Sequence, residues 1–587
     1  MSAFSPPCGP VVGWTDGDVV RATGIPYATA ARFAPPVPHP DWTEPRAATS
    51  WAPACPQPPM EELDAVLGSF AGLAVDEDCL RVSVTMPRDV RPDDALPVMV
   101  WIHGGSYVSG AGDVPIMDPA PLVAEQRVVV VTVTYRLGLL GYLGDGRDRP
   151  ANLGLLDQLE AFRWVARNIR AFGGDPDRVT AFGQSAGGDA VAHLLAVPEA
   201  AGLFRRAIVQ SAPLGISRGR RRMAAAMARA SRGLTAEMPV AEVLARQAEV
   251  ERAAVPFGLL GAMPFGTQYG HAPLPPESGI DAAWDAAAPG VDVLIGNTAE
   301  EARLFLPGIP WLTRLTRLPV AGPLVRRAAV AAVTGIVYGV PGRRFARRHA
   351  RAGGTAHRYV IRWSAPGSPF GAAHTVDLPL LFGDEEAWRG AGLLGGADWE
   401  GIQRDARRVR QVWGDFARGR IPTRQLIRAC WSCGACAAEL PTSEQVVDGR
   451  GDHVRIRHGH HVLGVRCRDP RALLEGRRGR PVRAHEVAPL AAGERARGRA
   501  RDHAHGDDGE RGGGSDEPRE ARKQVPLLRG GRARRPHRAG GVGGRREERL
   551  RQAGQRDPVQ PPQKPEPRER TSRAACVAKP MRAAREA

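Results

Sequence analysis

Ser185 lies between Gly183 and Gly187, at the spacing Gly-x-Ser-x-Gly. A serine hydroxyl attacks a carbonyl carbon only when the chain exposes it and a base activates it. The β-branched residues before Ser185 and the helical run after Asp189 predict a buried strand, a tight turn and a helix from about Ala186. Strand and helix backbones converge at such a turn, so small residues are needed on both sides of the serine. The pattern favours a nucleophile elbow over a plain glycine-rich turn.

A base and an orienting carboxylate must assist this serine. In proteins with such a turn, the three residues occur along the chain in the order serine, acid, histidine. The acid and the histidine lie on loops that follow later strands. Glu300 and Glu301 follow the apolar run that ends at Ile295, and His374 follows the run that ends near Arg362. Both carboxylates are candidates from this order alone. Four other histidines are interpreted as ordinary surface or core residues: His193, His271, His349 and His357.

The tetrahedral intermediate of such a reaction needs backbone N–H donors aimed at its oxyanion. Ala186, directly after the serine, offers one at the start of a helix. The turn His103-Gly104-Gly105-Ser106 follows an apolar strand and offers others, because glycine lets the backbone approach closely. The predicted oxyanion hole therefore draws on Gly104, Gly105, Ser106 and Ala186.

The elements around these residues alternate between strand and helix. Residues 96–102 and 127–134 are near-continuous apolar runs, which is typical of parallel strands buried on both faces. A helix is predicted over 154–170, and further strands over 206–211, 291–295 and 359–362. The apolar run 328–340 includes Gly335 and Gly339, is too short to span a bilayer, and is interpreted as a buried helix.

The chain resembles the type-B carboxylesterases, the α/β-hydrolase branch that includes cholinesterases and bacterial ester hydrolases. The resemblance covers about residues 10–422 and rests on blocks in family order: 24–28, 77–80, 101–105, 135–138, 152–158, 172–176, the turn at Ser185, and Trp413 with 416–418. It implies an α/β-hydrolase fold, in which a large, mostly parallel central sheet is flanked by helices. It also implies serine ester hydrolysis through an acyl-enzyme, without a cofactor or a metal.

The resemblance also assigns residues. The family's acid motif aligns on Glu301 rather than Glu300, although its usual Asp-Glu-Gly reads Glu300-Glu301-Ala302 here. The base motif aligns on His374, and the oxyanion donors on Gly105 and Ser106. Pairs outside the site are implied as well: a disulfide between Cys55 and Cys79 in an oxidising compartment, and salt bridges Arg136–Asp157 and Arg46–Glu77. Two alternatives stay open, a catalytically impaired cholinesterase-like protein and an amide or carbamate hydrolase on the same scaffold.

The formal net charge of +17 comes from one end of the chain. Residues 421–587 hold 37 Lys and Arg against 21 Asp and Glu, which leaves a net charge of +1 for residues 1–420. The same segment has 23 Leu, Ile, Val and Phe in 167 residues, too few for a charged chain to bury a core. We therefore predict a hydrolase domain over 1–422 and a disordered or aberrant Arg/Gly/Pro-rich tail over 423–587. A frameshift is favoured, because the break falls inside a family motif.

Two patterns in the tail suggest partners that we do not expect. Cys430, Cys433 and Cys436 have metal-ligand spacing, but a specific site would need a fold to hold them. The run Arg529–Arg538 lacks the aromatic residues of a specific nucleic-acid surface. The expected partner is a small-molecule ester. The first residues lack the pattern of a signal peptide and no membrane span is expected, which favours the cytoplasm, while the Cys55–Cys79 pair would fit secretion.

Overall fold

The computed structural model describes residues 2–59, 61–68, 72–306, 314–316, 318–319 and 321–420. The strands are β1 (Ser2–Phe4), β2 (Val11–Asp16), β3 (Val19–Pro26), β4 (Ala28–Thr29), β5 (Val37–Pro38), β6 (Arg46–Ala47), β7 (Arg81–Pro87), β8 (Leu96–Ile102), β9 (Val129–Val133), β10 (Gly174–Gln184), β11 (Arg206–Gln210), β12 (Asp292–Thr298) and β13 (Ala356–Ile361). The α-helices are α1 (Glu61–Leu67), α2 (Ala120–Gln126), α3 (Gly138–Gly141), α4 (Leu153–Asn168), α5 (Ala186–Leu194), α6 (Arg221–Ala230), α7 (Val240–Arg252), α8 (Ile280–Ala287), α10 (Ala321–Thr334), α11 (Val340–Arg351) and α12 (Trp399–Ala417).

One large mixed sheet organises these elements. Its strand order is β1-β2-β3-β7-β9-β8-β10-β11-β12-β13, and β6 pairs with β2 at one end. The strands from β9 to β13 run parallel, whereas β1, β2, β3, β7 and β9 pair antiparallel. Because the parallel strands all end at the same edge, the loops after β8, β10 and β12 meet there.

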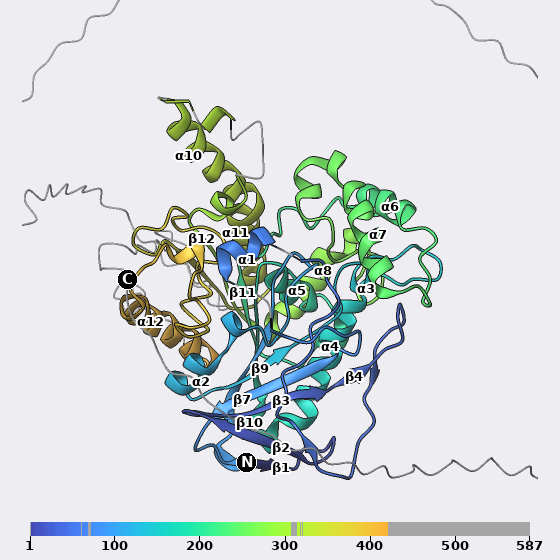
Figure 1. The fold of residues 1–587 in the computed structure, drawn as a ribbon, viewed down its shortest axis with the longest axis vertical. Coiled ribbons are helices and arrows are strands. Elements are labelled where there is room, and N and C mark those ends of the chain that lie inside the picture. Colours follow the sequence, from blue (N-terminus) through green and yellow to red (C-terminus); the bar gives the residue numbers. More distant parts are fainter. Residues whose placement is uncertain are drawn as a thin grey trace, which may run out of the picture. The chain divides into compact units, whose positions relative to one another are not determined.

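The central strands are buried on both faces, as their uninterrupted apolar sequences predicted. Along β8, Val98, Val100 and Ile102 belong to one hydrophobic cluster, while the alternate residues Met99 and Trp101 belong to another. Helices α4, α5 and α8 cover the first face, and α2 and α12 cover the second. Figure 1 shows α4 on one side of the sheet and α2 with α12 on the other.

The predicted elements around the serine turn are confirmed within a few residues. The strand expected over 96–102 is β8, the one expected over 127–134 is β9, and the helix expected over 154–170 is α4. The run 328–340 is helical, as predicted, but the prediction that it is buried is wrong. That run belongs to a longer helical stretch, Ala321–Arg351, whose most apolar window is only 22% buried. Many of its small apolar side chains face away from the rest of the protein, so composition did not indicate burial.

Of the two expected salt bridges, one is present and the other is not. Arg136 Nη2 donates to Asp157 Oδ1 at 2.7 Å, and both side chains are buried. Glu77, however, pairs with Arg32 rather than with Arg46. Arg46 instead places its guanidinium 4.5 Å from the centre of the Trp42 ring. Arg46 lies in β6 at the sheet edge, where stacking on that ring keeps it away from Glu77.

The expected disulfide between Cys55 and Cys79 is not formed in this structure. Both are buried free thiols, and Cys55 Sγ accepts a hydrogen bond from Leu137 N at 3.3 Å. The side-chain hydrogen bond with Cys55, together with burial, holds the pKa of the Cys79 thiol well above its usual value. The Cys79 thiol is therefore neutral beside Cys55 inside the core. The predicted tail over 423–587, with Cys430, Cys433 and Cys436, lies outside the described residues.

Candidate active site

Ser185 lies at the tip of a sharp turn between β10 and α5. Its backbone has φ 58° and ψ −123°, a conformation that non-glycine residues rarely adopt. The turn is held from both sides, because Ser185 N donates to Gln210 O at 2.9 Å and Asp189 N donates to Ser185 O at 2.9 Å. The strained backbone that is typical of a nucleophile elbow is therefore present, and hydrogen bonds from neighbouring backbone hold it in place.

The glycines beside Ser185 are required by close backbone contacts. A Cβ at Gly183 would lie 2.7 Å from Ile102 O, and a Cβ at Gly187 would lie 2.0 Å from the same oxygen. A Cβ at Gly104 would lie 3.2 Å from the Cβ of Ser185. The elbow and the turn after β8 are thus packed directly against each other, with no room for larger residues.

The turn after β8 presents backbone N–H groups near the serine. Within the described part of the chain, no hydrogen bond uses the N–H of Gly105, Ser106 or Ala186. Gly105 has φ 107° and Ser106 has φ 55°, so the backbone turns back sharply here. A group of unused N–H donors beside a strained serine is what an oxyanion hole requires.

His103 fixes the orientation of this turn. Its Nδ1 donates to Gly104 O at 2.8 Å, and burial lowers the pKa of His103 to about 4, so the ring is neutral. In a trans peptide the C=O and the next N–H point in opposite directions. Since His103 holds the Gly104 carbonyl on one side, the N–H of Gly105 must point to the other.

A buried carboxylate joins the same turn to the elbow helix. Tyr107 Oη donates to Asp189 Oδ2 at 2.7 Å, and Ser217 Oγ donates to Asp189 Oδ1 at 2.5 Å. Burial alone would raise the pKa of Asp189, but the adjacent His193 and the hydroxyl donors outweigh it and hold the pKa below its usual value. Asp189 is therefore a charged anchor that ties the turn after β8 to α5.

Glu301 and His374 come from loops after β12 and β13 and meet beside the elbow. His374 Nδ1 donates to Glu301 Oε2 at 2.5 Å, and both side chains are buried. The other carboxylate oxygen, Glu301 Oε1, accepts from Thr298 N at 2.6 Å. Because Nδ1 carries the proton, Nε2 of His374 is the acceptor, and it lies 3.3 Å from Gln184 Nε2, one residue before Ser185.

Ser185 Oγ itself makes no hydrogen bond to another described residue. The structure therefore brings the acid and the histidine together and places the histidine beside the elbow, with the Gln184 amide on the nitrogen that a nucleophile would use. Gln184 was not singled out from the sequence. Its position inside the Gly-x-Ser-x-Gly turn was the available signal.

Glu300, the alternative acid, points elsewhere. Its Oε2 accepts from Arg303 Nη1 at 2.9 Å and from Ala372 N at 3.1 Å, and its side chain is 37% exposed. It therefore braces the loop that carries the histidine without contacting the imidazole. The neighbouring Glu301 is completely buried.

Two aromatic rings and a second carboxyl surround His374. Phe305 and Tyr338 have ring centres 5.2 and 5.4 Å from the imidazole. Asp377, three residues after His374, accepts from Gln210 Nε2 at 2.7 Å, and its other oxygen has no partner among the described residues. Burial raises the pKa of Asp377 to about 6, and the nearby Glu301 adds to this. In the sequence, Asp377 belongs to the same His-x-x-Asp-Leu segment as His374.

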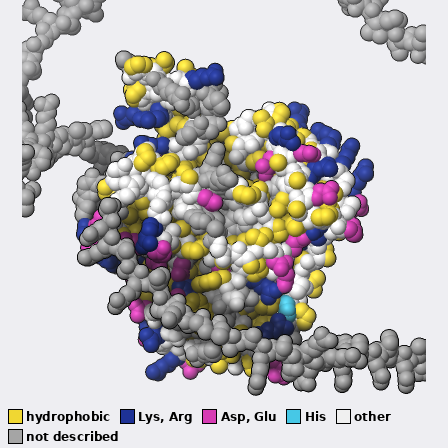
Figure 2. Space-filling model, in the orientation of Figure 1, with side chains coloured by type: hydrophobic (Ala, Val, Ile, Leu, Met, Phe, Trp, Pro, Cys, Tyr) yellow, Lys and Arg dark blue, Asp and Glu magenta, His cyan; other side chains and the backbone are white. Residues whose placement is uncertain are grey.

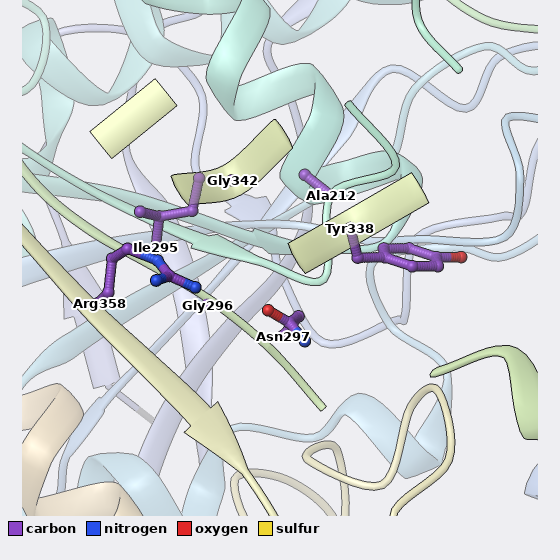
Figure 3. Close-up of a pocket in the computed structure, with 7 residues that line it drawn as sticks. All are labelled: Ala212, Ile295, Gly296, Asn297, Tyr338, Gly342 and Arg358. Atoms are coloured by element: carbon purple, nitrogen blue, oxygen red, sulfur yellow. The ribbon is translucent and has the colours of Figure 1, made fainter. Parts of the chain in front are cut away.

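A small cavity lies at the end of β12, behind Tyr338. It is lined by Ala212, Ile295, Gly296, Asn297, Tyr338, Gly342 and Arg358. Figure 3 shows the Tyr338 ring extending away from Ile295 and Arg358. Since the same ring packs on His374, the cavity borders the candidate site.

Comparisons with known proteins identify the family of this chain. A sequence model of the Carboxylesterase family matches residues 8–311. A probable N-octanoylanthranilate hydrolase from Rhodococcus erythropolis is 40% identical over 433 residues, which cover 71% of this chain and 92% of that protein. The para-nitrobenzyl esterase of Bacillus subtilis (strain 168) is 33% identical over 457 residues, covering 71% and 90%.

Solved structures give the same result. A thermophilic PNB esterase superposes with a TM-score of 0.60 at 31% identity, covering 72% of this chain and 92% of that one. The Geobacillus stearothermophilus carboxylesterase EST55 superposes with a TM-score of 0.58 at 29% identity, covering 75% and 94%. The chain therefore belongs to the type-B carboxylesterase family, with the α/β-hydrolase fold, and is a carboxylic ester hydrolase.

Proposed function

We propose that Ser185, His374 and Glu301 hydrolyse carboxylic esters as a catalytic triad through an acyl-enzyme. The observation that carries this proposal is the 2.5 Å hydrogen bond from His374 Nδ1 to Glu301 Oε2, made beside the strained Ser185 turn. That bond fixes the tautomer in which Nε2 has a free lone pair, as a general base requires.

In the acylation step, Ser185 Oγ attacks the ester carbonyl carbon while His374 Nε2 takes the hydroxyl proton. The Gln184 amide that lies 3.3 Å from Nε2 gives way to the serine hydroxyl as substrate binds. Negative charge develops on the carbonyl oxygen, and the N–H groups of Gly105, Ser106 and Ala186 stabilise it. Gly104 lets the turn approach the serine closely enough for this.

The intermediate then collapses and the carbon–oxygen bond to the alcohol breaks. The leaving alkoxide takes the proton from His374, which returns the imidazole to its neutral form and leaves the acyl group on Ser185. In the second half, His374 removes a proton from water, the resulting hydroxide attacks the acyl carbon, and Ser185 is released with its proton restored. Glu301 stabilises the imidazolium that forms in both halves.

A fluorophosphonate probe and one substitution test the assignment. The probe should modify Ser185 in the full chain, as located by peptide mass spectrometry, and hydrolysis of a para-nitrobenzyl ester should stop when labelling is complete. Ser185→Ala should abolish labelling and nearly all turnover while leaving the thermal transition in place. Ser211→Ala is the matched control, because Ser211 is also buried and also has a positive φ of 47°. Ester turnover that survives in Ser185→Ala would overturn the triad.

Amide hydrolysis is a second candidate function. It is favoured by the 40% identity to a probable N-octanoylanthranilate hydrolase, since that name denotes an acyl group on an amine nitrogen. The acyl-enzyme would be the same, but the leaving group would be an amine, which needs the His374 proton more than an alkoxide does. Turnover of N-octanoylanthranilate, lost in Ser185→Ala, would support it. Turnover of octanoyl esters alone would restrict the chain to esters.

A further inference from the structure

The chain next to the acid Glu301 has an unusual charge composition. Residues 302–376 contain twelve arginines and no aspartate or glutamate. Since residues 1–420 as a whole have a net charge of +1, the rest of that part has a net charge of −11. The basic charge of the hydrolase part is therefore concentrated in one continuous segment.

Exposed apolar side chains are concentrated in the same segment. Of eleven large hydrophobic residues exposed in the described part of the chain, six lie between residues 305 and 340: Phe305, Leu315, Leu318, Leu324, Ile336 and Val340. Leu324 is 68% exposed and Ile336 is 57% exposed. Figure 2 shows hydrophobic and basic side chains together, without acidic ones, over the part that Figure 1 labels α10. Such a concentration marks an interaction surface.

Leu324, Ile336 and Val340 lie on a helical stretch formed by α10, a π-helical turn at Gly335–Gly339, and α11, and α10 is exposed around most of its circumference. The stretch packs on the protein through Val330, Thr334, Val337 and Phe345. We call the exposed residues Leu324, Ile336, Val340, Arg326, Arg327, Arg343 and Arg344 together the basic apolar face. These four arginines are exposed and form no ion pair among the described residues, whereas Arg348 nearby pairs with Asp281 and Asp285.

We propose that the basic apolar face docks on the surface of an anionic lipid bilayer. Exposed aliphatic side chains flanked by arginines suit the boundary between acyl chains and anionic headgroups, and each arginine near such a surface contributes to binding. By length and composition alone, Ala321–Arg351 could cross a membrane. The buried contacts of Gly342, Phe345 and His349 hold α11 against the protein, so this helix lies on a bilayer and does not span it.

Other occupants fit the face less well. A second copy would bring two strongly basic segments together, and the tail over 421–587 is itself basic, with 37 Lys and Arg against 21 Asp and Glu. Nucleic acid would satisfy the arginines but would leave Leu324, Ile336 and Val340 without an apolar partner. An anionic lipid surface is the partner that uses both kinds of side chain.

The face is connected directly to the candidate active site. Ala302 N, next to Glu301, donates to Thr334 Oγ1 of α10 at 3.2 Å. Tyr338, in the π-helical turn, packs its ring 5.4 Å from that of His374. Docking through this face would place the candidate site beside the lipid surface. The docking itself goes beyond the proposed hydrolysis and does not depend on it.

Vesicle sedimentation of the full chain tests the proposal. Phosphatidylcholine vesicles with phosphatidylglycerol should bind the protein, and vesicles of phosphatidylcholine alone should bind it far more weakly. Arg326→Glu with Arg327→Glu should weaken binding at least about 30-fold, since two cationic contacts are lost. Leu324→Ser, Ile336→Ser and Val340→Ser together should weaken it at least about 10-fold. Turnover of a soluble ester should be unchanged in both variants, which shows that they fold.

Matched controls separate this face from other surfaces. Arg404→Glu with Arg407→Glu changes the same charge on the exposed side of α12, and Val255→Ser with Leu259→Ser removes exposed apolar residues elsewhere. Both controls should bind like the wild type. Hydrogen exchange should slow over residues 321–340 when the anionic vesicles are added.

Three outcomes would overturn the proposal. Unchanged exchange over 321–340, or variants that bind as well as the wild type, would assign vesicle binding to the basic tail. Binding that the arginine variant loses but the serine variant keeps would indicate a polyanion such as nucleic acid. A concentration-dependent dimer that only the serine variant dissolves would make the face a contact between copies.

Discussion

The two sides of the candidate site are built in different ways. On the nucleophile side, β8, its turn, β10 and α5 are packed so closely that a Cβ at Gly187 would lie 2.0 Å from Ile102 O. On the acid–base side, Glu301 and His374 stand on loops after β12 and β13, and a helix with exposed leucine and isoleucine adjoins them. The strained backbone conformation of Ser185 is held by these close backbone contacts. The partners of the serine are positioned by side-chain contacts that a single substitution can break.

The largest expected effect concerns the two adjacent carboxylates on the acid–base side. Glu301→Gln should lower kcat for ester hydrolysis by about 10²- to 10⁴-fold, because an amide can neither offset the imidazolium charge nor enforce the Nδ1–H tautomer. Glu300→Gln is the matched control and should cost less than about 10-fold, since Glu300 contacts Arg303 and Ala372 rather than His374. Steady-state kinetics on one soluble ester decide the matter. Equal losses of kcat in the two variants would mean that the assignment of Glu301 as the acid is wrong.

On the nucleophile side, a methyl group should be enough to disrupt the structure. Gly187→Ala should lower the free energy of unfolding by about 3 kcal/mol or more, because the new Cβ meets a backbone oxygen that cannot move aside. Gly290→Ala is the control, since nothing lies within 4 Å of its Cβ position, and it should be neutral or slightly stabilising. Urea unfolding followed by circular dichroism measures both. A fully stable Gly187→Ala protein would show that the contact between elbow and β8 turn is looser than described.

A smaller effect should appear on the acid–base side as a dependence of folding stability on pH. Asp377 has a folded-state pKa of about 6, above its ordinary value of 3.8, so protonation stabilises the folded protein. That contribution is complete below about pH 4 and is lost as the pH rises through about 6, which is worth up to about 3 kcal/mol. Asp377→Asn cannot ionise. Its stability relative to the wild type should therefore increase from about pH 4 to about pH 8 in urea unfolding. A constant difference across this range would mean that Asp377 is charged throughout.

The sequence by itself determined the nucleophile side and the sheet. Uninterrupted apolar runs and the spacing of Gly183, Ser185 and Gly187 are local signals, and they indicated β8, β9, β10 and α5 within a few residues. The reason is physical, since a strand buried on both faces and a turn without room for a Cβ each limit the residue types at their own positions. Glu301 and His374 were likewise candidates from the sequence, because each lies in a loop that follows a predicted strand.

The tertiary structure decided what depends on residues far apart in the chain. The family motif favoured Glu301 over Glu300, and in the structure the Glu301 carboxylate reaches His374 whereas the Glu300 carboxylate reaches Arg303. In the structure Glu77 pairs with Arg32 rather than with Arg46, and Cys55 and Cys79 are thiols. A helix that composition suggested was buried is exposed. Adjacent or similar residues have the same local pattern. Only the distances between their side chains and their partners separate them, and those distances exist only in the folded chain.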